Sequence, residues 1–174
     1  MLPMVQHVRE FQKAKAIMVE EGLDLEKIEV GIMVETPGAA LTIEDFIADG
    51  IDFISFGTND LTQYTLAVDR GNAKVANLFQ PLHPAVLRLI KQTIDAAHAN
   101  GKWVGMCGEL AGMTKAIPIL LGFGLDEFSM NPRAIPEAKY LIGQLTDERA
   151  RKIANQAMSF GTATDIEDYI KGTL

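Results

Sequence analysis

The sequence predicts an α/β fold in which helices pack against a parallel sheet. Four short apolar runs have the length and continuity of strands that are buried on both faces. They lie at about 28–35, 51–57, 103–107 and 126–130. The first two predicted strands start about 23 residues apart, as do the last two, which is the length of a compact βα unit. Repeated βα units favour parallel strands with right-handed crossovers.

The remaining elements follow from hydrophobic spacing and from helix-ending residues. Residues 1–4 are predicted to be the end of a strand. Residues 61–82 are expected to be irregular, and this is long for a connection that usually has roughly 2–6 residues. A capping box, Thr164-Asp-Ile-Glu167, is predicted to start the last helix. The predicted helices lie at about 5–18, 37–48, 84–100, 114–122, 135–145, 147–158 and 164–171.

Two architectures fit this order of elements: a doubly wound sheet, or part of a (β/α)₈ barrel. A whole barrel needs eight strands and typically ~250 residues. With four strands and a stub at 1–4, a barrel here would be the second half, from the end of strand 4 to helix 8. We therefore expect a partial barrel domain at 1–145 and a helical tail at 146–174.

Composition narrows the range of partners. The 174 residues are 48% hydrophobic and 22% charged, which is ordinary for a soluble α/β protein. A net charge of −7 argues against nucleic acid and anionic membranes as partners. No apolar run approaches the ~20 residues needed to cross a bilayer, and no leader opens the chain. A single cysteine excludes an internal disulfide, so we expect a cytoplasmic protein.

Two carboxylates stand at the ends of consecutive predicted strands. Glu35 and Asp60 should face the same mouth, because parallel strands end at one edge of a sheet and lie ~4.8 Å apart. Few, oxygen-only ligands suit Mg²⁺, with Mn²⁺ as the alternative. The structural alternative is that Glu35 caps the next helix and Asp60 fixes a turn.

Three more residues near these strand ends carry useful chemistry. Asn59 could donate to a phosphate or carboxylate oxygen, or could simply form a turn. Arg70 could bind such a group in a bidentate manner, or could be solvated. Cys107 could be a proton donor or nucleophile at the mouth, or a small core residue. Glu109, Ser129 and Asn131 are weaker candidates, and the three histidines fall on or next to helices.

Five linked motifs resemble those of the phosphoenolpyruvate (PEP)-utilising enzymes, over about residues 1–145. Their order and spacing are most similar to the branch that serves the bacterial sugar phosphotransferase system. The motifs are Met33-Val-Glu-Thr-Pro37, Gly57-Thr-Asn-Asp-Leu-Thr-Gln-Tyr64, Ala67-Val-Asp-Arg70, Gly105-Met-Cys-Gly-Glu109 and Gly124-Leu-Asp-Glu-Phe-Ser-Met130.

The resemblance implies a PEP/pyruvate-type TIM barrel with an assigned site. Glu35 and Asp60 match the family's Mg²⁺ ligands. Asn59, Asp60 and Arg70 match substrate-binding positions, and Cys107 matches the residue that protonates enolpyruvate. The family reaction passes the phosphoryl group to a histidine on another domain and then to the phosphocarrier protein HPr, releasing pyruvate. Homo-oligomers are typical of the family.

The same resemblance implies parts that this chain does not contain. The accepting histidine, its domain and the first barrel strands are missing, so we expect part of a longer protein with little phosphotransferase activity alone. Two other functions stay open. One is a segment of a PEP synthase or pyruvate phosphate dikinase, and the other is a non-catalytic module that binds Mg²⁺ and PEP.

Overall fold

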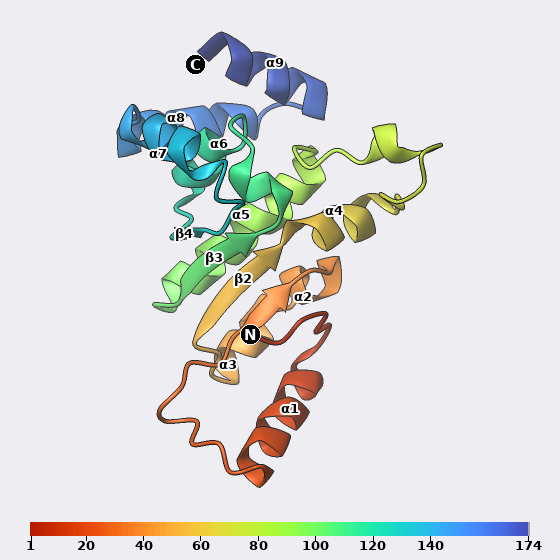
Figure 1. The fold of residues 1–174 in the computed structure, drawn as a ribbon, viewed down its shortest axis with the longest axis vertical. Coiled ribbons are helices and arrows are strands. Elements are labelled where there is room, and N and C mark those ends of the chain that lie inside the picture. The colour runs from red at the N-terminus through yellow and green to blue at the C-terminus, as the bar shows by residue number, and fades with distance from the viewer. Residues whose placement is uncertain (174) are drawn as a thin grey trace.

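The computed structural model describes residues 1–173, in which four parallel strands form one sheet (Figure 1). Their order in the sheet follows their order in the chain, β1-β2-β3-β4. Leu2 pairs with Ile32 outside β1, as expected for the end of a strand. The strands are β1 (Ile32–Val34), β2 (Phe53–Gly57), β3 (Trp103–Cys107) and β4 (Glu127–Phe128).

The order of the strands in the sheet can be compared with the two predicted architectures. The prediction of a parallel α/β fold is confirmed. A doubly wound sheet reverses its strand order at a switch point. The order of the four described strands does not reverse, so this part of the chain contains no switch point.

Nine α-helices and two short 3₁₀ helices accompany the strands in the described residues, and none of the helices is long and apolar enough to cross a membrane. The helices before β3 are α1 (Val8–Glu20), α2 (Pro37–Leu41), α3 (Ile43–Ala48), α4 (Thr58–Leu66), η1 (Ala76–Leu78) and α5 (Pro84–Ala99). Those after β3 are η2 (Glu109–Gly112), α6 (Ile117–Phe123), α7 (Ile135–Gly143), α8 (Asp147–Ala157) and α9 (Ala163–Thr173).

Three predicted elements differ from the structure. The first residues of the segment predicted to be irregular, 61–66, belong to α4, because Leu61 is fully buried and holds the helix against the core. The helix expected at 37–48 is two helices, which meet at Thr42. The last helix is capped by Thr162, whose Oγ1 accepts a hydrogen bond from the Asp165 amide at 3.1 Å, and not by Thr164. Both threonines precede an acidic residue by three positions, so the motif alone could not choose between them.

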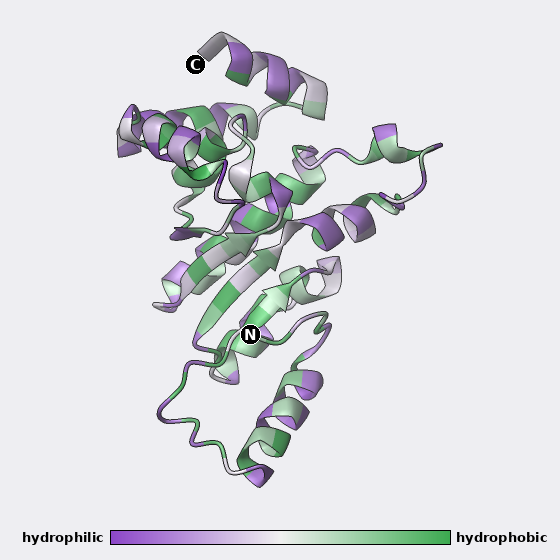
Figure 2. Ribbon diagram, in the orientation of Figure 1, coloured by the Kyte–Doolittle hydropathy of each residue, from purple (hydrophilic) through white to green (hydrophobic). Residues whose placement is uncertain are grey.

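The two faces of the sheet differ in what covers them. Six side chains on one face are fully buried, and helices α2, α3 and α5 pack in that layer. Figure 2 shows the strands as mostly hydrophobic, whereas α4 is hydrophilic. The opposite face carries the alternate residues of the strands, among them Phe53 and Ser55 of β2 and Trp103 and Cys107 of β3. The six buried side chains are Ile32, Val34, Ile54, Phe56, Val104 and Met106.

The C-terminal helices share the core of the sheet. Buried residues of α8 and α9 belong to the same hydrophobic cluster as the strands, and α8 packs closely on α6. The closest approach is at Gly122, where an added Cβ would lie 2.2 Å from the Ala150 carbonyl oxygen. That oxygen is backbone and cannot swing aside, so only glycine fits at this crossing.

We therefore expect Gly122→Ala to lower the free energy of unfolding by about 1 to 3 kcal/mol, since α6 and α8 must move apart to accept the methyl group. Urea denaturation measures this. Gly143→Ala is the matched control, because nothing lies within 4 Å of its Cβ position. The control should change stability by less than about 1 kcal/mol. Equal effects of the two substitutions would contradict the packing of α8 on α6.

Candidate active site

A pocket of about 300 Å³ lies at the carboxyl ends of β2, β3 and β4. Its wall contains Asn59 and Cys107, which come from different strand ends. The three weaker candidates also line it. The lining residues are Asn59, Cys107, Gly108, Glu109, Ser129, Met130 and Asn131.

Cys107 is the last residue of β3 and is held by the neighbouring strand. Its thiol donates a hydrogen bond to the Phe56 carbonyl oxygen at 3.4 Å. The Ser55 hydroxyl lies 4.0 Å from Sγ and donates to it. Thr58 Oγ1 donates to the Cys107 carbonyl oxygen at 3.3 Å. These contacts fix the thiol at the pocket wall, where it is partly exposed.

Asn59 belongs to the first turn of α4 and is not the turn former that the sequence left open. Its Oδ1 accepts a hydrogen bond from the Glu109 backbone amide at 3.3 Å. This bond fixes the orientation of the side-chain amide, so that Nδ2 remains a donor for another group. Asn59 therefore links two strand ends and offers N–H groups to an anionic ligand.

Glu35 follows β1 and its side chain is almost fully buried, with 6% exposed. Its Oε2 accepts a hydrogen bond from the Met4 amide at 2.7 Å. Its Cγ and Oε1 lie across Gly57, where an added Cβ would be only 2.4 Å and 2.6 Å from them. Glu35 does not cap the next helix, because Thr36 caps α2 and accepts a hydrogen bond from the Ala39 amide.

Asp60, on the first turn of α4, and Arg70, just after the helix, lie near each other. The Arg70 Nη2 atom is 3.9 Å from Asp60 Oδ1, and its backbone amide donates to Gln63 Oε1 at 3.1 Å. The Arg70 side chain is 43% exposed and the Asp60 side chain 31% exposed. Both are therefore positioned by α4 and remain open to a ligand.

The donor set fits a hard divalent cation. Among residues 1–173, no lysine, arginine or histidine side chain pairs with the buried Glu35 carboxylate, although a buried charge is costly without a partner. The glycine at position 57 leaves the space that this carboxylate occupies. The described residues do not gather three or more His, Cys, Asp or Glu side chains into a metal-binding group. A pair of carboxylates leaves positions for water and substrate oxygens, as Mg²⁺ requires.

The structure thus brings some predicted site residues together more tightly than others. Cys107 and Asn59 share one pocket, and Asp60 and Arg70 form a loose pair. Glu35 lies over the end of β2 but does not line that pocket. Ser55 and Thr58 were missed by the sequence analysis. The signal for Ser55 was a lone hydroxyl inside an otherwise apolar strand.

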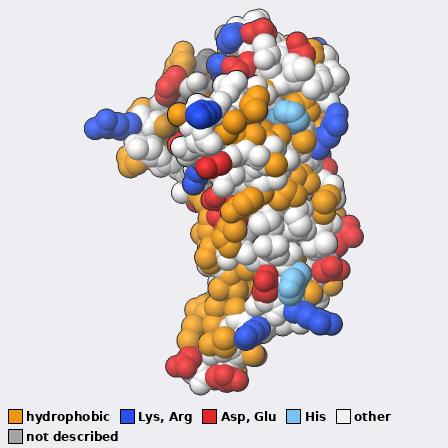
Figure 3. All heavy atoms as spheres, turned by 90° about the vertical axis from the view of Figure 1, so that its right-hand side faces the viewer, with side chains coloured by type: hydrophobic (Ala, Val, Ile, Leu, Met, Phe, Trp, Pro, Cys, Tyr) orange, Lys and Arg blue, Asp and Glu red, His pale blue; other side chains and the backbone are white. Residues whose placement is uncertain are grey.

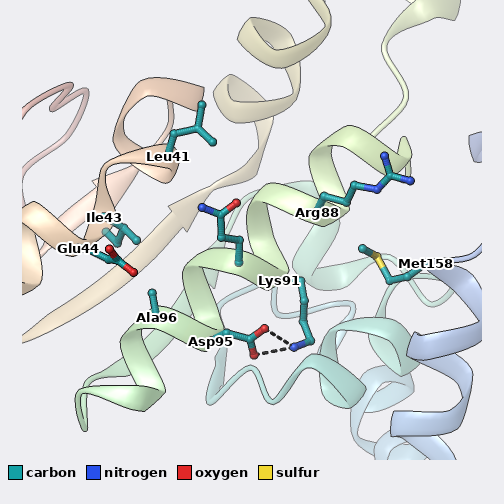
Figure 4. A pocket seen from close by; sticks show the side chains of 9 residues that line it. Leu41, Ile43, Glu44, Arg88, Lys91, Asp95, Ala96 and Met158 are labelled. Carbon is teal, nitrogen blue, oxygen red and sulfur yellow. Dashed lines mark hydrogen bonds and ion pairs between the residues drawn. The ribbon is translucent and has the colours of Figure 1, made fainter.

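A second concavity, of about 560 Å³, lies on the outer surface between α3 and α5 (Figure 4). Arg88 and Lys91 project from α5 into it, and Lys91 is paired with Asp95 at a hydrogen-bonding distance of 2.6 Å. None of the predicted site residues lines this groove. Its wall offers neither a strand end nor a cysteine, so it does not compete with the strand-end pocket as the site of chemistry.

The three histidines lie outside the pocket, at helix starts or in a pair with an aspartate. His7 and His83 precede α1 and α5 as N-cap residues, and His83 Nδ1 accepts a bond from the Ala85 amide. His98 lies 2.8 Å from Asp126 Oδ2, which also accepts a bond from the Val104 amide at the start of β3. That pair is at the opposite end of the strands from Cys107.

Comparison with known proteins gives a consistent result. Residues 1–146 match the family model described as "PEP-utilising enzyme, PEP-binding domain". A phosphoenolpyruvate-protein phosphotransferase of Bacillus sp. (strain S) is 51% identical over 181 aligned residues, which cover 99% of this chain. The protein of the same name from Haemophilus influenzae is 50% identical over 179 residues and 98% of this chain. This chain spans 31% of the length of each of these relatives.

Proposed function

The chain belongs to the PEP-utilising enzymes, whose PEP-binding domain it matches, and we propose that its strand-end site binds PEP for phosphoryl transfer. The observation that carries this proposal is the buried Glu35 carboxylate, which lies beside Gly57 without a cationic partner in the described residues. A carboxylate in this position serves an enzyme best as a ligand of a cation that also holds an anionic substrate.

Each residue of the proposed site has one task. Glu35 and Asp60 would hold Mg²⁺, or Mn²⁺ in its place, and the bound cation supplies positive charge to the oxygens of PEP. Asn59 donates an N–H group to the substrate phosphate, and Arg70 neutralises the charge that spreads over it. Phosphoryl transfer depends mainly on such positioning and charge neutralisation. Cys107 gives the proton that turns the methylene carbon of enolpyruvate into the methyl group of pyruvate.

The proposed reaction takes its partners from the relatives. They are named phosphoenolpyruvate-protein phosphotransferases, so the phosphoryl group would pass to a protein. We propose a histidine outside this chain as the first acceptor and the phosphocarrier protein HPr as the second. His7, His83 and His98 are unsuitable acceptors, because two lie at helix starts and the third pairs with Asp126. The names of these relatives favour this function over a PEP synthase or dikinase.

We also propose that the sheet is half of a (β/α)₈ barrel. The sequential strand order and the helices on one face support this. The other face exposes 37% of Trp103, which stacks on Phe53 with ring centroids 4.5 Å apart. In a closed barrel such a face is the packed interior. Residues 1–145 would then form the half barrel, and the residues after 145 a helical extension, whose described part, 146–173, packs on it.

An open face of this kind favours self-association of the isolated chain. Figure 3 shows further hydrophobic side chains gathered in the lower part of one side, where α1 lies. The exposed hydrophobic residues of this part of the chain include Ile17 and Val19 on α1, and Leu23 and Ile28 after it. We expect a homo-oligomer. A stable monomer in light scattering would contradict that expectation.

Isothermal titration calorimetry tests the proposed function directly. PEP should bind the chain in the presence of Mg²⁺ and far more weakly in its absence, because two carboxylates would otherwise face an anionic ligand. Binding that is equally strong with and without Mg²⁺ would contradict the metal site. No binding in either condition would contradict the proposed substrate.

A further inference from the structure

The Ser55 hydroxyl has an unusual environment within the described residues. The side chain is 3% exposed, and its single hydrogen bond there goes to the Cys107 sulfur at 4.0 Å. Buried hydroxyls normally bond to oxygen or nitrogen, because sulfur is a weak acceptor. A serine that merely stabilised this strand would gain little from such a partner, and an alanine would fill the position at almost no cost.

The strand register places the Ser55 hydroxyl next to the Cys107 thiol on the same face of the sheet. Ser55 pairs with Gly105 in the sheet, and Gly57 pairs with Cys107 two residues closer to the carboxyl ends. The side chains of alternate residues in a strand point to the same face. Ser55 and Cys107 therefore lie on one face in successive rows, with glycine opposite each of them. Two carboxylates fill the space that these glycines leave, since the Glu127 side chain lies over Gly105 and the Glu35 side chain over Gly57.

The thiol has two contacts of opposite kind. It donates its proton toward the Phe56 carbonyl oxygen at 3.4 Å, and it accepts the O–H of Ser55. The first contact orients the neutral thiol, since a carbonyl oxygen can only accept. The second becomes stronger when the sulfur carries a negative charge, because a hydrogen bond to an ionised group is roughly twice as strong as a neutral one.

We infer that Ser55 is a positioning residue for proton transfer, which stabilises the thiolate form of Cys107. The inference rests on the proposed role of Cys107 as proton donor. When the phosphoryl group leaves for a histidine nitrogen, the electron pair of the broken O–P bond forms the carbonyl of pyruvate. The C=C electron pair takes the thiol proton, and the S–H pair stays on sulfur. The Ser55 O–H then donates to the thiolate until water restores its proton.

Alkylation of the single cysteine tests this without any turnover. The rate of iodoacetamide labelling, followed by mass spectrometry across a range of pH, has a midpoint that reports thiolate formation. Its plateau at high pH reports how accessible the thiol is. Ser55→Ala should move the midpoint upward by about 0.5 to 1 pH unit, a three- to tenfold loss of thiolate below the midpoint. Ser55→Thr keeps the hydroxyl and should stay near the original midpoint.

Thr93→Val is the matched control. Thr93 is a fully buried hydroxyl on α5 without a hydrogen-bond partner in the described residues, and it lies outside the site. Its removal should leave the midpoint unchanged. A Ser55→Ala midpoint equal to that of the original chain would overturn the inference, as would an equal shift in Thr93→Val or Ser55→Thr.

A second readout separates this inference from the proposed function. Exchange of the pyruvate methyl protons in D₂O, with Mg²⁺ present, requires the thiolate to take a proton from the methyl group. If Cys107→Ala leaves that exchange unchanged, the proposed proton donor is wrong. If Cys107→Ala abolishes exchange while Ser55→Ala changes neither exchange nor the alkylation midpoint, only the inference about Ser55 fails.

Discussion

Glu35→Gln is expected to remove the metal-dependent part of PEP binding, lowering the affinity measured with Mg²⁺ by about 100-fold or more. The substitution keeps the shape of the side chain and removes the charge that would hold the cation. Loss of even an outer-shell partner of a metal costs about 10- to 100-fold in affinity, and a direct ligand should cost at least as much. Titration calorimetry with PEP in the presence and absence of Mg²⁺ gives the result.

The same variant should not weaken the fold. Glu35 is buried and has no cationic partner in the described part of the chain, so neutralising it removes a cost to the metal-free state. Urea denaturation of metal-free protein should show equal or slightly greater stability. Glu44→Gln, an exposed carboxylate on α3, is the matched control and should bind PEP normally. Parallel losses of binding and stability would show that Glu35 is a structural residue.

Gly57→Ala offers a second route to the same site. The added Cβ would lie 2.4 Å from Glu35 Cγ and would displace the side chain without changing its charge. A loss of Mg²⁺-dependent binding similar to that of Glu35→Gln would show that the position of the carboxylate matters as well as its charge.

Cys107→Ala is expected to have the second large effect, on proton transfer and not on binding. General acid–base groups contribute about 10²- to 10⁴-fold to rate, so exchange of the pyruvate methyl protons should fall at least 100-fold. The affinity for PEP with Mg²⁺ should change less than about threefold, because the thiol does not bind the charged phosphate or carboxylate group of the substrate. Proton NMR in D₂O follows the exchange.

Cys107→Ser tests whether a group of similar shape to the thiol can replace it. The hydroxyl can occupy the thiol's place between Phe56 and Ser55, yet a hydroxyl gives up its proton far less readily than a thiol. Its exchange rate should therefore stay close to that of Cys107→Ala. An unchanged rate in either variant would assign the proton to another group of the pocket. Glu109 and Ser129 line the pocket and carry side chains that can donate a proton.

Much of the fold was accessible from the sequence because apolar runs mark buried strands directly. The position of Cys107 at a strand end was predicted for this reason, and the pocket beside it lies where parallel strands end. The resemblance to the PEP-utilising enzymes, which rested on five motifs, is confirmed by the family match over residues 1–146. The roles of the individual site residues remain predictions.

Other features could not be read from sequence because they depend on contacts between distant segments. Helix α4 consists largely of polar residues, and it forms because Leu61 finds a buried place that the local sequence does not reveal. The close approach of Glu35 to Gly57 joins residues of two strands. Ser55 gave only a lone hydroxyl in an apolar run, and its proximity to Cys107 emerged from the strand register.

We propose that one cation, held by Glu35 and Asp60, anchors PEP beside Cys107. The most direct test is a crystal structure with Mn²⁺ and PEP, in which the anomalous scattering of manganese locates the ion independently of the protein atoms. We expect one strong peak at the carboxyl ends of β1 and β2, with both carboxylates bound to the ion. A peak that neither carboxylate touches, or PEP bound elsewhere on the molecule, would contradict it.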